Sequence, residues 1–257
     1  MTSPILEATG LAIAYGGIRA VDGMDIQVFP GSITGLIGPN GAGKSTLFNL
    51  LSGVTKPQSG RVAHRGEDIT TLPPWRRARR GMIRTFQLSR EFAGMTVLEN
   101  LMMAPQGQLG ERLLPLFLQP RRVREEDAKH YARALEVLEI SNLGQVRDRQ
   151  AGDLSGGQKK LLELARTLMI DCDTILLDEP GAGVNPALMK TLSDMIAVLN
   201  RDHGKTFLIV EHDMDLIRKL CDPVVVMSEG KPLMRGTFDQ IRADARVMRA
   251  YLGGAHV

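Results

Sequence analysis

A short glycine-rich segment, Gly38–Ser45, constrains the fold of this chain more than any other feature. Its sequence, GPNGAGKS, matches GxxxxGK[ST] at every fixed position, and the apolar run Ile33–Ile37 comes directly before it. The residues that follow predict a helix that begins near Gly43 and ends at Gly53. A glycine-rich turn between a strand and a helix is typical of α/β proteins that bind phosphate groups. The alternative, a strand-to-helix turn without a ligand, fits the complete motif less well.

The same segment carries the groups that a nucleoside triphosphate needs. Its glycines let backbone N–H groups converge on phosphate oxygens, and the new helix adds its free amides. Lys44 supplies a positive charge for the β and γ phosphates, and the Ser45 hydroxyl is a hard oxygen ligand suited to Mg²⁺. We therefore expect the nucleotide to contact Gly38, Pro39, Asn40, Gly41, Ala42, Gly43, Lys44, Ser45 and Thr46.

Two acidic residues follow a second apolar strand, Thr174–Asp178. Ligands of open α/β sheets bind beyond the carboxyl ends of the strands, so Asp178 is placed to hold Mg²⁺ directly or through water. Glu179 could orient or deprotonate the attacking water. The alternative to a catalytic site is that Asp178 and Glu179 are two solvated acids at the end of a strand. The strand Thr206–Glu211 and the amphipathic helix Ala187–Leu199 complete a strand–helix–strand pattern that implies a parallel sheet.

The middle of the chain has helical rather than strand periodicity, from about residue 90 to residue 165. Helices are predicted over Val97–Met103 and Glu125–Leu138. The segment Ala104–Arg124 is rich in Gly, Pro, Gln and Arg, which favours a loop-rich insertion. The sequence thus predicts an α/β core interrupted by a helical insertion.

Composition narrows the possible partners. The 257 residues carry a net charge of +3, a basic bias too weak to indicate nucleic acid. No apolar run approaches the roughly 18 residues needed to span a bilayer, and the N-terminus does not resemble a signal peptide. Cys172 and Cys221 lack metal-binding spacing and are expected to be buried, reduced thiols of a cytosolic protein. Any work at a membrane would therefore need a partner.

The segment Leu154–Gln158, LSGGQ, predicts a helix start, with Ser155 and Gln158 forming a capping box. Between a GxxxxGK[ST] segment and an Asp-Glu-Pro strand end, this motif resembles the signature of ABC-transporter ATPases, and the resemblance covers essentially the whole chain. It implies a P-loop NTPase (RecA-like) core with an N-terminal antiparallel β subdomain and an inserted α-helical subdomain. The expected division is 1–87, 88–166 and 167–257, with the signature in the middle part.

The resemblance also assigns roles. A head-to-tail dimer would place Ser155, Gly156, Gly157 and Gln158 against the γ-phosphate held by the opposite subunit. Further positions match the family one by one. Tyr15 resembles the aromatic residue that stacks on adenine, Gln87 the Q-loop glutamine that contacts Mg²⁺, and His212 the switch histidine at the γ-phosphate. The structural alternatives are that Tyr15 is a core residue, Gln87 a surface residue and His212 a capped core residue. The expected catalytic residues are Glu179, His212 and Lys44, and the expected Mg²⁺ ligands are Ser45, Gln87 and Asp178.

The chain departs from the family pattern at one position. Asn185 stands where most members carry an aspartate in the D-loop. Asparagine still forms hydrogen bonds but brings no charge, so an interface role is expected and a charge-based role is not.

Several local features resemble the LivG-like ATPases of importers for branched-chain and other hydrophobic amino acids. They are Ile83–Gln87 with Met95–Asn100, the insertion after Met103, Gly181–Pro186 with Glu211–Met214, and the ending Arg249–Gly253. The resemblance implies two transmembrane permease subunits, a second ATPase (LivF-like or another copy of this chain) and an extracytoplasmic solute-binding protein. It also implies a peripheral location on the cytoplasmic face of the inner membrane and no nucleic-acid partner.

Other classes of protein stay open at this point. The run Leu72–Gly81 is also similar to the ATPase of the lipopolysaccharide-export transporter. Its four arginines could indicate phosphate binding but are more typical of a solvated helix face. A non-transport ABC protein acting on ribosomes or DNA would resemble tandem ATPase units or carry long coiled coils, which this sequence lacks. A catalytically dead scaffold would need damage at Lys44, Glu179 or Ser155, and all three are intact.

Overall fold

The computed structural model describes residues 3–85, 91–111 and 113–253. The chain divides into two compact units. The first comprises Met1–Gln87, Cys172–Gly181 and Ile196–Val257, and the second comprises Leu88–Asp171 and Ala182–Met195.

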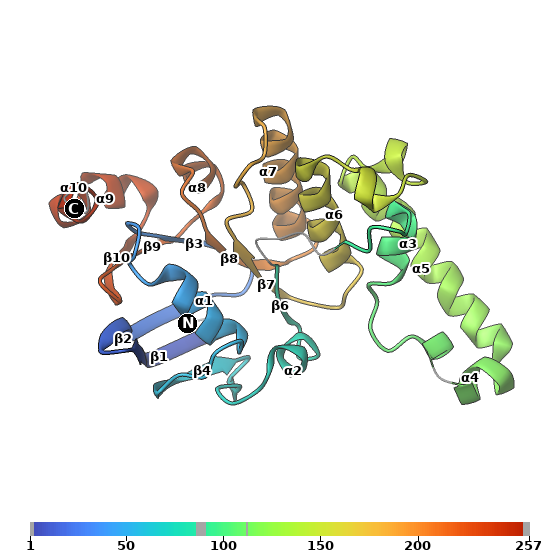
Figure 1. Cartoon of the computed structure of the whole chain (residues 1–257), viewed down its shortest axis with the longest axis horizontal. Coiled ribbons are helices and arrows are strands. Elements are labelled where there is room, and N and C mark those ends of the chain that lie inside the picture. Colours follow the sequence, from blue (N-terminus) through green and yellow to red (C-terminus); the bar gives the residue numbers. More distant parts are fainter. Residues whose placement is uncertain (1–2, 86–90, 112, 254–257) are drawn as a thin grey trace. The chain divides into compact units, whose positions relative to one another are not determined.

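The first unit contains a four-stranded antiparallel sheet with the order β2-β1-β4-β5. Its strands are β1 (Leu6–Tyr15), β2 (Ile18–Val28), β4 (Ser59–His64) and β5 (Glu67–Asp68). From Met24 to Val28 of β2 the buried positions alternate with exposed ones, as expected for a sheet that covers a core with one face. This sheet confirms the expected antiparallel β part (Figure 1).

The same unit contains a six-stranded sheet with the order β10-β9-β3-β8-β7-β6. β3 (Ile33–Ile37), β8 (Thr206–Val210) and β7 (Thr174–Asp178) lie at its centre. β6 (Met82–Arg84) and β9 (Val224–Ser228) flank them, and all five strands run parallel. Only β10 (Lys231–Gly236) pairs antiparallel, with β9. Every residue of β3, β7 and β8 is buried, as is typical of parallel strands covered on both faces. The predicted parallel sheet is confirmed.

Five helices of the first unit are α1 (Lys44–Ser52), α2 (Pro74–Ala78), α8 (Met214–Leu220), α9 (Phe238–Ala243) and α10 (Ala245–Gly253). α1 follows β3 directly and buries its apolar face in the core. It ends where predicted, because Gly53 adopts a left-handed conformation and its amide bonds the Leu50 carbonyl.

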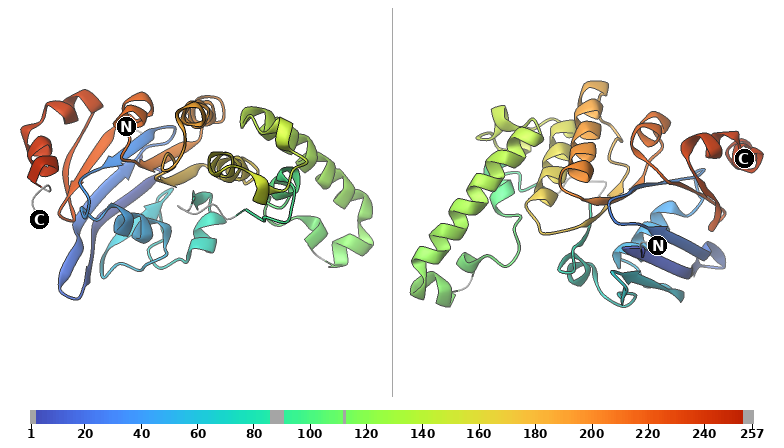
Figure 2. Two further views of the ribbon diagram at one scale, coloured as in Figure 1. Left: turned by 45° about the horizontal axis from the view of Figure 1, so that its top comes forward. Right: turned by 180° about the vertical axis from the view of Figure 1, so that it is seen from behind.

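The second unit is helical. Its helices are α3 (Val97–Met102), α4 (Leu113–Leu118), α5 (Pro120–Ile140) and α6 (Gly156–Leu168), with short 3-10 turns at Leu109–Glu111, Gly144–Val146 and Ala151–Asp153. The long helix α5 packs against α3 and α6 and also contacts α4 (Figure 2). Helix α7 (Pro186–Arg201) begins in this unit and ends in the first.

The predicted loop over Ala104–Arg124 is wrong in its second half. α4 and the first residues of α5 lie there instead. The prolines that suggested a loop are compatible with helix, because Pro120 occupies the first turn of α5 and Pro115 the first turn of α4, where no intrahelical amide bond is needed.

Cys172 and Cys221 are both buried, as predicted. Among the described residues, none of the helices combines the length and the hydrophobicity needed to cross a bilayer.

Candidate functional site

A pocket of about 520 Å³ lies in the first unit where β3 meets α1. Its size is within the range of small-molecule sites. Most of the predicted phosphate-binding segment lines it, together with the start of β2. Glu179, after β7, and His212, after β8, also line it. Its lining comprises Ile18, Arg19, Ala20, Asn40, Gly41, Ala42, Gly43, Lys44, Ser45, Thr46, Glu179, His212, Glu229 and Gly230.

The N-terminus of α1 opens into this pocket with free amide groups. Gly43 is its N-cap, with φ 98°, and no side chain caps the helix. The first described intrahelical bond runs from the Leu47 amide to the Gly43 carbonyl. The amides before Leu47 therefore have no helical carbonyl to bond, and the positive end of the helix dipole adds to their attraction for an anion. This arrangement fits a phosphate group.

Lys44 is buried, with 6% of its surface exposed. Its Nζ donates hydrogen bonds to the carbonyl oxygens of Gly38 at 2.6 Å and Pro39 at 2.8 Å. These two residues do not line the pocket but hold the lysine head group beside it. Burial lowers the pKa of Lys44, and the negative charge of Glu179 partly opposes that effect. A bound phosphate would bring an anion into direct contact with the ammonium.

Asp178 offers one oxygen to a cation. The residue is 3% exposed, and its Oδ2 accepts a hydrogen bond from Arg84 Nη2 at 2.7 Å. Its Oδ1 is buried and has no hydrogen-bond partner among the described residues. Such an orphaned carboxylate oxygen is costly unless a water or an ion satisfies it. Together with the exposed Ser45 hydroxyl, it fits Mg²⁺, which prefers oxygen ligands and needs few from the protein.

This donor set does not form an all-protein metal site. Within residues 3–85, 91–111 and 113–253, no three His, Cys, Asp or Glu side chains lie together as such a site would require. The arrangement therefore suits an ion whose other ligands are phosphate oxygens and water.

Glu179 and His212 contact each other at the pocket. The His212 Nε2 and the Glu179 Oε1 lie 3.1 Å apart. Glu179 has a left-handed backbone with φ 48°, a conformation that non-glycine residues adopt at a cost. Its amide bonds the Val210 carbonyl, which anchors this turn to the end of β8. Backbone strain at the carboxylate predicted to be catalytic is the pattern expected of a functional residue.

Glu211 is a residue of the site that the sequence analysis did not single out. It is 4% exposed, and its carboxylate accepts hydrogen bonds from the amides of Gly181 at 2.5 Å, His212 at 2.9 Å and Asp213 at 3.3 Å. It thereby ties the loop after Glu179 to the loop that carries His212. One feature of the sequence could have pointed to Glu211: it is an acid at the end of an apolar strand, directly before His212.

The signature residues lie in the second unit, at the N-terminus of α6. Ser155 Oγ accepts the Gln158 amide at 3.3 Å, and the Gln158 side chain accepts the Ser155 amide at 3.1 Å. The predicted capping box is confirmed. Ser155 and Gly156 are exposed, whereas Gly157 is buried.

Three further positions singled out from the sequence are Tyr15, Gln87 and Asn185. Tyr15 is half exposed at the end of β1 and is not part of the pocket lining. Gln87 lies outside the described residues. Asn185 uses its Oδ1 to accept the Leu188 amide at 2.9 Å, so this side chain already bonds the first turn of α7.

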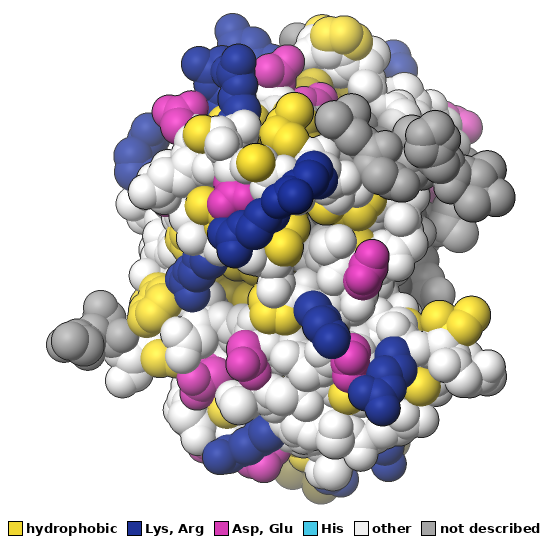
Figure 3. All heavy atoms as spheres, turned by 90° about the vertical axis from the view of Figure 1, so that its left-hand side faces the viewer, with side chains coloured by type: hydrophobic (Ala, Val, Ile, Leu, Met, Phe, Trp, Pro, Cys, Tyr) yellow, Lys and Arg dark blue, Asp and Glu magenta, His cyan; other side chains and the backbone are white. Residues whose placement is uncertain are grey.

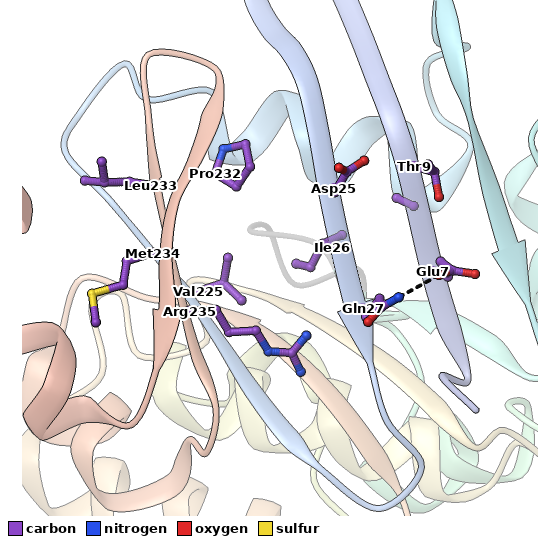
Figure 4. A pocket seen from close by; sticks show the side chains of 11 residues that line it. Glu7, Thr9, Asp25, Ile26, Gln27, Val225, Pro232, Leu233, Met234 and Arg235 are labelled. Atoms are coloured by element: carbon purple, nitrogen blue, oxygen red, sulfur yellow. Dashed lines mark hydrogen bonds between the residues drawn. The ribbon is translucent and has the colours of Figure 1, made fainter. Parts of the chain in front are cut away.

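A second pocket in the first unit has a different character (Figure 4). Carboxylates of Glu7 and Asp25 lie in its lining, with Arg235 on the β10 side. Glu7 accepts a hydrogen bond from Gln27, and Asp25 accepts the Gly10 amide. Two acids and a single arginine in this lining disfavour a polyphosphate. The pocket lined by the glycine-rich segment, called the P-loop pocket below, is therefore the better nucleotide site. On the surface shown in Figure 3, basic and acidic side chains are interspersed.

Sequence comparisons agree with this geometry. Residues 21–182 match the ABC transporter family, and residues 229–257 match the branched-chain amino acid ATP-binding cassette transporter family. The chain is 41% identical over 255 residues to the high-affinity branched-chain amino acid transport ATP-binding protein LivG of Escherichia coli K12, covering 99% of this chain and 100% of LivG. It is 43% identical over 257 residues to BraF of Pseudomonas aeruginosa, with the same coverage.

Solved structures point the same way. The crystal structure of the ADP conformation of MJ1267, an ATP-binding cassette of an ABC transporter, matches with a TM-score of 0.81 and 35% identity, covering 98% of this chain and 100% of MJ1267. A nucleotide-free ATP-binding cassette from an ABC transporter matches with a TM-score of 0.80 and 35% identity, over 96% of this chain and 98% of that one. The relatives favour the branched-chain group over lipopolysaccharide export and over non-transport ABC proteins. The chain therefore belongs to the ATP-binding subunits of ABC transporters, in the group that contains LivG and BraF.

Proposed function

We propose that this chain binds and hydrolyses Mg-ATP to power the import of branched-chain or other hydrophobic amino acids through separate permease subunits. The observation that carries the proposal is the meeting of Lys44, Glu179 and His212 around one pocket at the carboxyl ends of β3, β7 and β8. Ligands of open parallel sheets bind at this edge. The names of the full-length relatives support the solute class.

In this proposal the residues of the first unit divide the work. The amides at the start of α1 and the Lys44 ammonium bind and orient the phosphates. Glu179 holds the attacking water and accepts its proton, and His212 orients Glu179 through their contact. Ser45 and Asp178 would hold Mg²⁺, with Gln87 as the further proposed ligand. When bound, that ion neutralises charge on the phosphate oxygens.

The signature residues act on a second subunit. Ser155 and the amides of Gly156 and Gly157 would contact the γ-phosphate bound to the opposite ATPase, as in a head-to-tail dimer. Gln158 supports them through the capping box. Tyr15 is proposed to stack on adenine. The subdomains are proposed to span 1–87, 88–166 and 167–257.

The assembly proposed around the chain has several parts. Two permeases would anchor it to the cytoplasmic face of the inner membrane. A LivF-like ATPase or a second copy of this chain would complete the dimer, and an extracytoplasmic protein would bind the solute.

Replacement of Glu179 by Gln tests the catalytic part of the proposal. The amide keeps the size of the side chain but cannot accept the water proton. We expect ATP hydrolysis to fall by at least about 100-fold, while ATP binding is retained and dimers accumulate with ATP and Mg²⁺. Phosphate release and size-exclusion chromatography measure the two effects.

Glu67→Gln is the matched control, because Glu67 is an exposed carboxylate that pairs with Arg80 outside the pocket. It should hydrolyse ATP at the wild-type rate. Turnover of Glu179→Gln within a few-fold of wild type would remove Glu179 from the catalytic role. Absence of ATP binding by the wild-type chain at millimolar ATP and Mg²⁺ would refute the proposed function as a whole.

A further inference from the structure

Arg84 is a largely buried arginine whose side chain bonds three side chains from two elements. It is the last residue of β6, and its side chain is 11% exposed. Nη2 donates to Asp178 Oδ2 at 2.7 Å at the end of β7. Nη1 donates to Asn49 Oδ1 at 2.6 Å and to Ser52 Oγ at 3.1 Å, both on α1. The guanidinium carbon also lies 5.8 Å from the centre of the Phe48 ring.

An arginine at this place is not explained by packing alone. The pair of Arg84 and Asp178 is almost completely removed from water, and the desolvation of two such charges cancels most of their attraction. An apolar side chain of similar volume would stabilise the fold at least as well. The guanidinium instead provides donors in a fixed planar geometry, which can hold acceptors on two elements at once.

The two elements held by Arg84 carry the two described groups proposed to hold Mg²⁺. Asn49 lies about one helical turn after Ser45 on the same helix. Asp178 is bound through Oδ2 alone, and its Oδ1 has no hydrogen-bond partner among the described residues. One guanidinium therefore links the helix that presents the Ser45 hydroxyl to the carboxylate whose second oxygen is buried without a hydrogen-bond partner among the described residues.

We propose that Arg84 is a positioning residue, which fixes α1 against the end of β7 so that the Ser45 hydroxyl and Asp178 Oδ1 keep the separation that Mg²⁺ bound with ATP requires. Arg84 touches neither the ion nor the nucleotide in this role. The inference rests on the proposed function, since it assumes that ATP and Mg²⁺ bind in the P-loop pocket. Octahedral coordination at short bond lengths makes Mg²⁺ sensitive to small displacements of its ligands.

The test compares Arg84→Lys with Asn49→Ala in the full-length chain. Lysine keeps the charge beside Asp178 but cannot hold both elements with one rigid fork, so any effect reports geometry rather than electrostatics. Asn49→Ala leaves the pair of Arg84 and Asp178 and removes one contact to α1. Mn²⁺ serves as the probe, and its binding at a fixed ATP concentration is measured by electron paramagnetic resonance. ATP affinity is measured separately in EDTA with a fluorescent analogue.

We expect each variant to raise the half-saturating Mn²⁺ concentration, by about 10-fold for Arg84→Lys, as is typical when a residue that supports metal ligands is changed. ATP affinity in EDTA should stay within about threefold, because the α1 amides and Lys44 are unchanged. The double variant should bind Mn²⁺ little more weakly than Arg84→Lys alone, since both changes break the same link. Arg80→Lys, at an exposed arginine paired with Glu67, is the matched control and should bind Mn²⁺ like wild type.

Wild-type Mn²⁺ binding by both variants would overturn the inference. So would a parallel loss of Mn²⁺ and metal-free ATP binding, which would show that Arg84 only supports the fold. Should Arg84→Lys not fold, Asn49→Ala decides by the same criteria. These outcomes differ from failure of the proposed function, in which wild-type protein itself would bind neither ATP nor Mn²⁺ with ATP.

Discussion

At the scale of single residues, backbone conformation decides whether the phosphate loop can form. Gly43 has φ 98° and brings its backbone so close to the β2 strand that an added Cβ would lie 2.1 Å from the Ala20 carbonyl oxygen. Gly41 has φ 78°, but an added Cβ would meet nothing within 4 Å. Both positions disfavour an L side chain, yet only Gly43 also lacks space for one.

This difference predicts different outcomes for two similar changes. Gly43→Ala should abolish ATP binding, because the start of α1 must shift away from Ala20. Gly41→Ala should cost only about 1–2 kcal/mol of stability from the left-handed conformation and should keep measurable ATP binding. Isothermal titration with ATP and urea unfolding check both variants. Equal ATP affinity of the two variants would contradict the role of the Ala20 contact.

At the scale of elements, helix starts carry much of the proposed chemistry, and they are built in two ways. The N-terminus of α1 has no side-chain cap, which leaves its amides for a phosphate. The N-terminus of α6 has a complete capping box, in which the Ser155 oxygen accepts the Gln158 amide. Because that oxygen accepts, the Ser155 hydroxyl hydrogen stays available to donate to a phosphate of a second subunit.

Replacement of Ser155 separates the two tasks of this side chain. Ser155→Ala should destabilise the isolated chain by about 1 kcal/mol, the usual cost of a lost cap, and should also lower ATP hydrolysis. Ser155→Thr keeps a hydroxyl that can cap and donate, so it should restore most of both properties. Urea unfolding and phosphate release measure them. Unchanged stability of Ser155→Ala would show that the serine does not cap α6 in solution.

At the scale of the whole molecule, one buried histidine connects the two sheets of the first unit. His64 of β4 is 2% exposed, and its Nε2 lies 3.0 Å from Thr174 Oγ1 on β7. Burial lowers the pKa of His64 to about 4, Arg65 adds to the effect and Glu67 opposes it. Asp173 Oδ1 lies 3.5 Å away but does not outweigh burial.

The depressed pKa predicts that the folded chain loses stability in mild acid. In the unfolded chain this histidine takes up a proton near pH 6.5, whereas in the folded chain it resists protonation until about pH 4. Stability is therefore lost as the pH falls between these values, by about 2 kcal/mol from pH 6.5 to pH 5. Urea unfolding at pH 6.5 and pH 5 should show a smaller loss of folding stability for His64→Gln than for the wild-type chain. His203→Gln, at a histidine that is not buried, should behave like wild type. An identical pH dependence for His64→Gln and wild type would contradict the assignment.

Local sequence determined the parts of this protein whose atoms are neighbours along the chain. The P-loop, the buried strands β3, β7 and β8 and the capping box of α6 could be predicted, because hydrogen bonds and periodicity within a few residues specify them. The insertion was predicted less well, since proline in the first turn of a helix and proline in a loop give the same local signal.

Tertiary structure alone decided which distant side chains meet. Arg84 reaches Asp178 and Asn49 only because β6 pairs with β7 and α1 packs nearby. Glu211 likewise joins two loops from different strands. A contact between residues far apart in sequence depends on the order of the strands in the sheet, and that order is a property of the whole core rather than of any single segment.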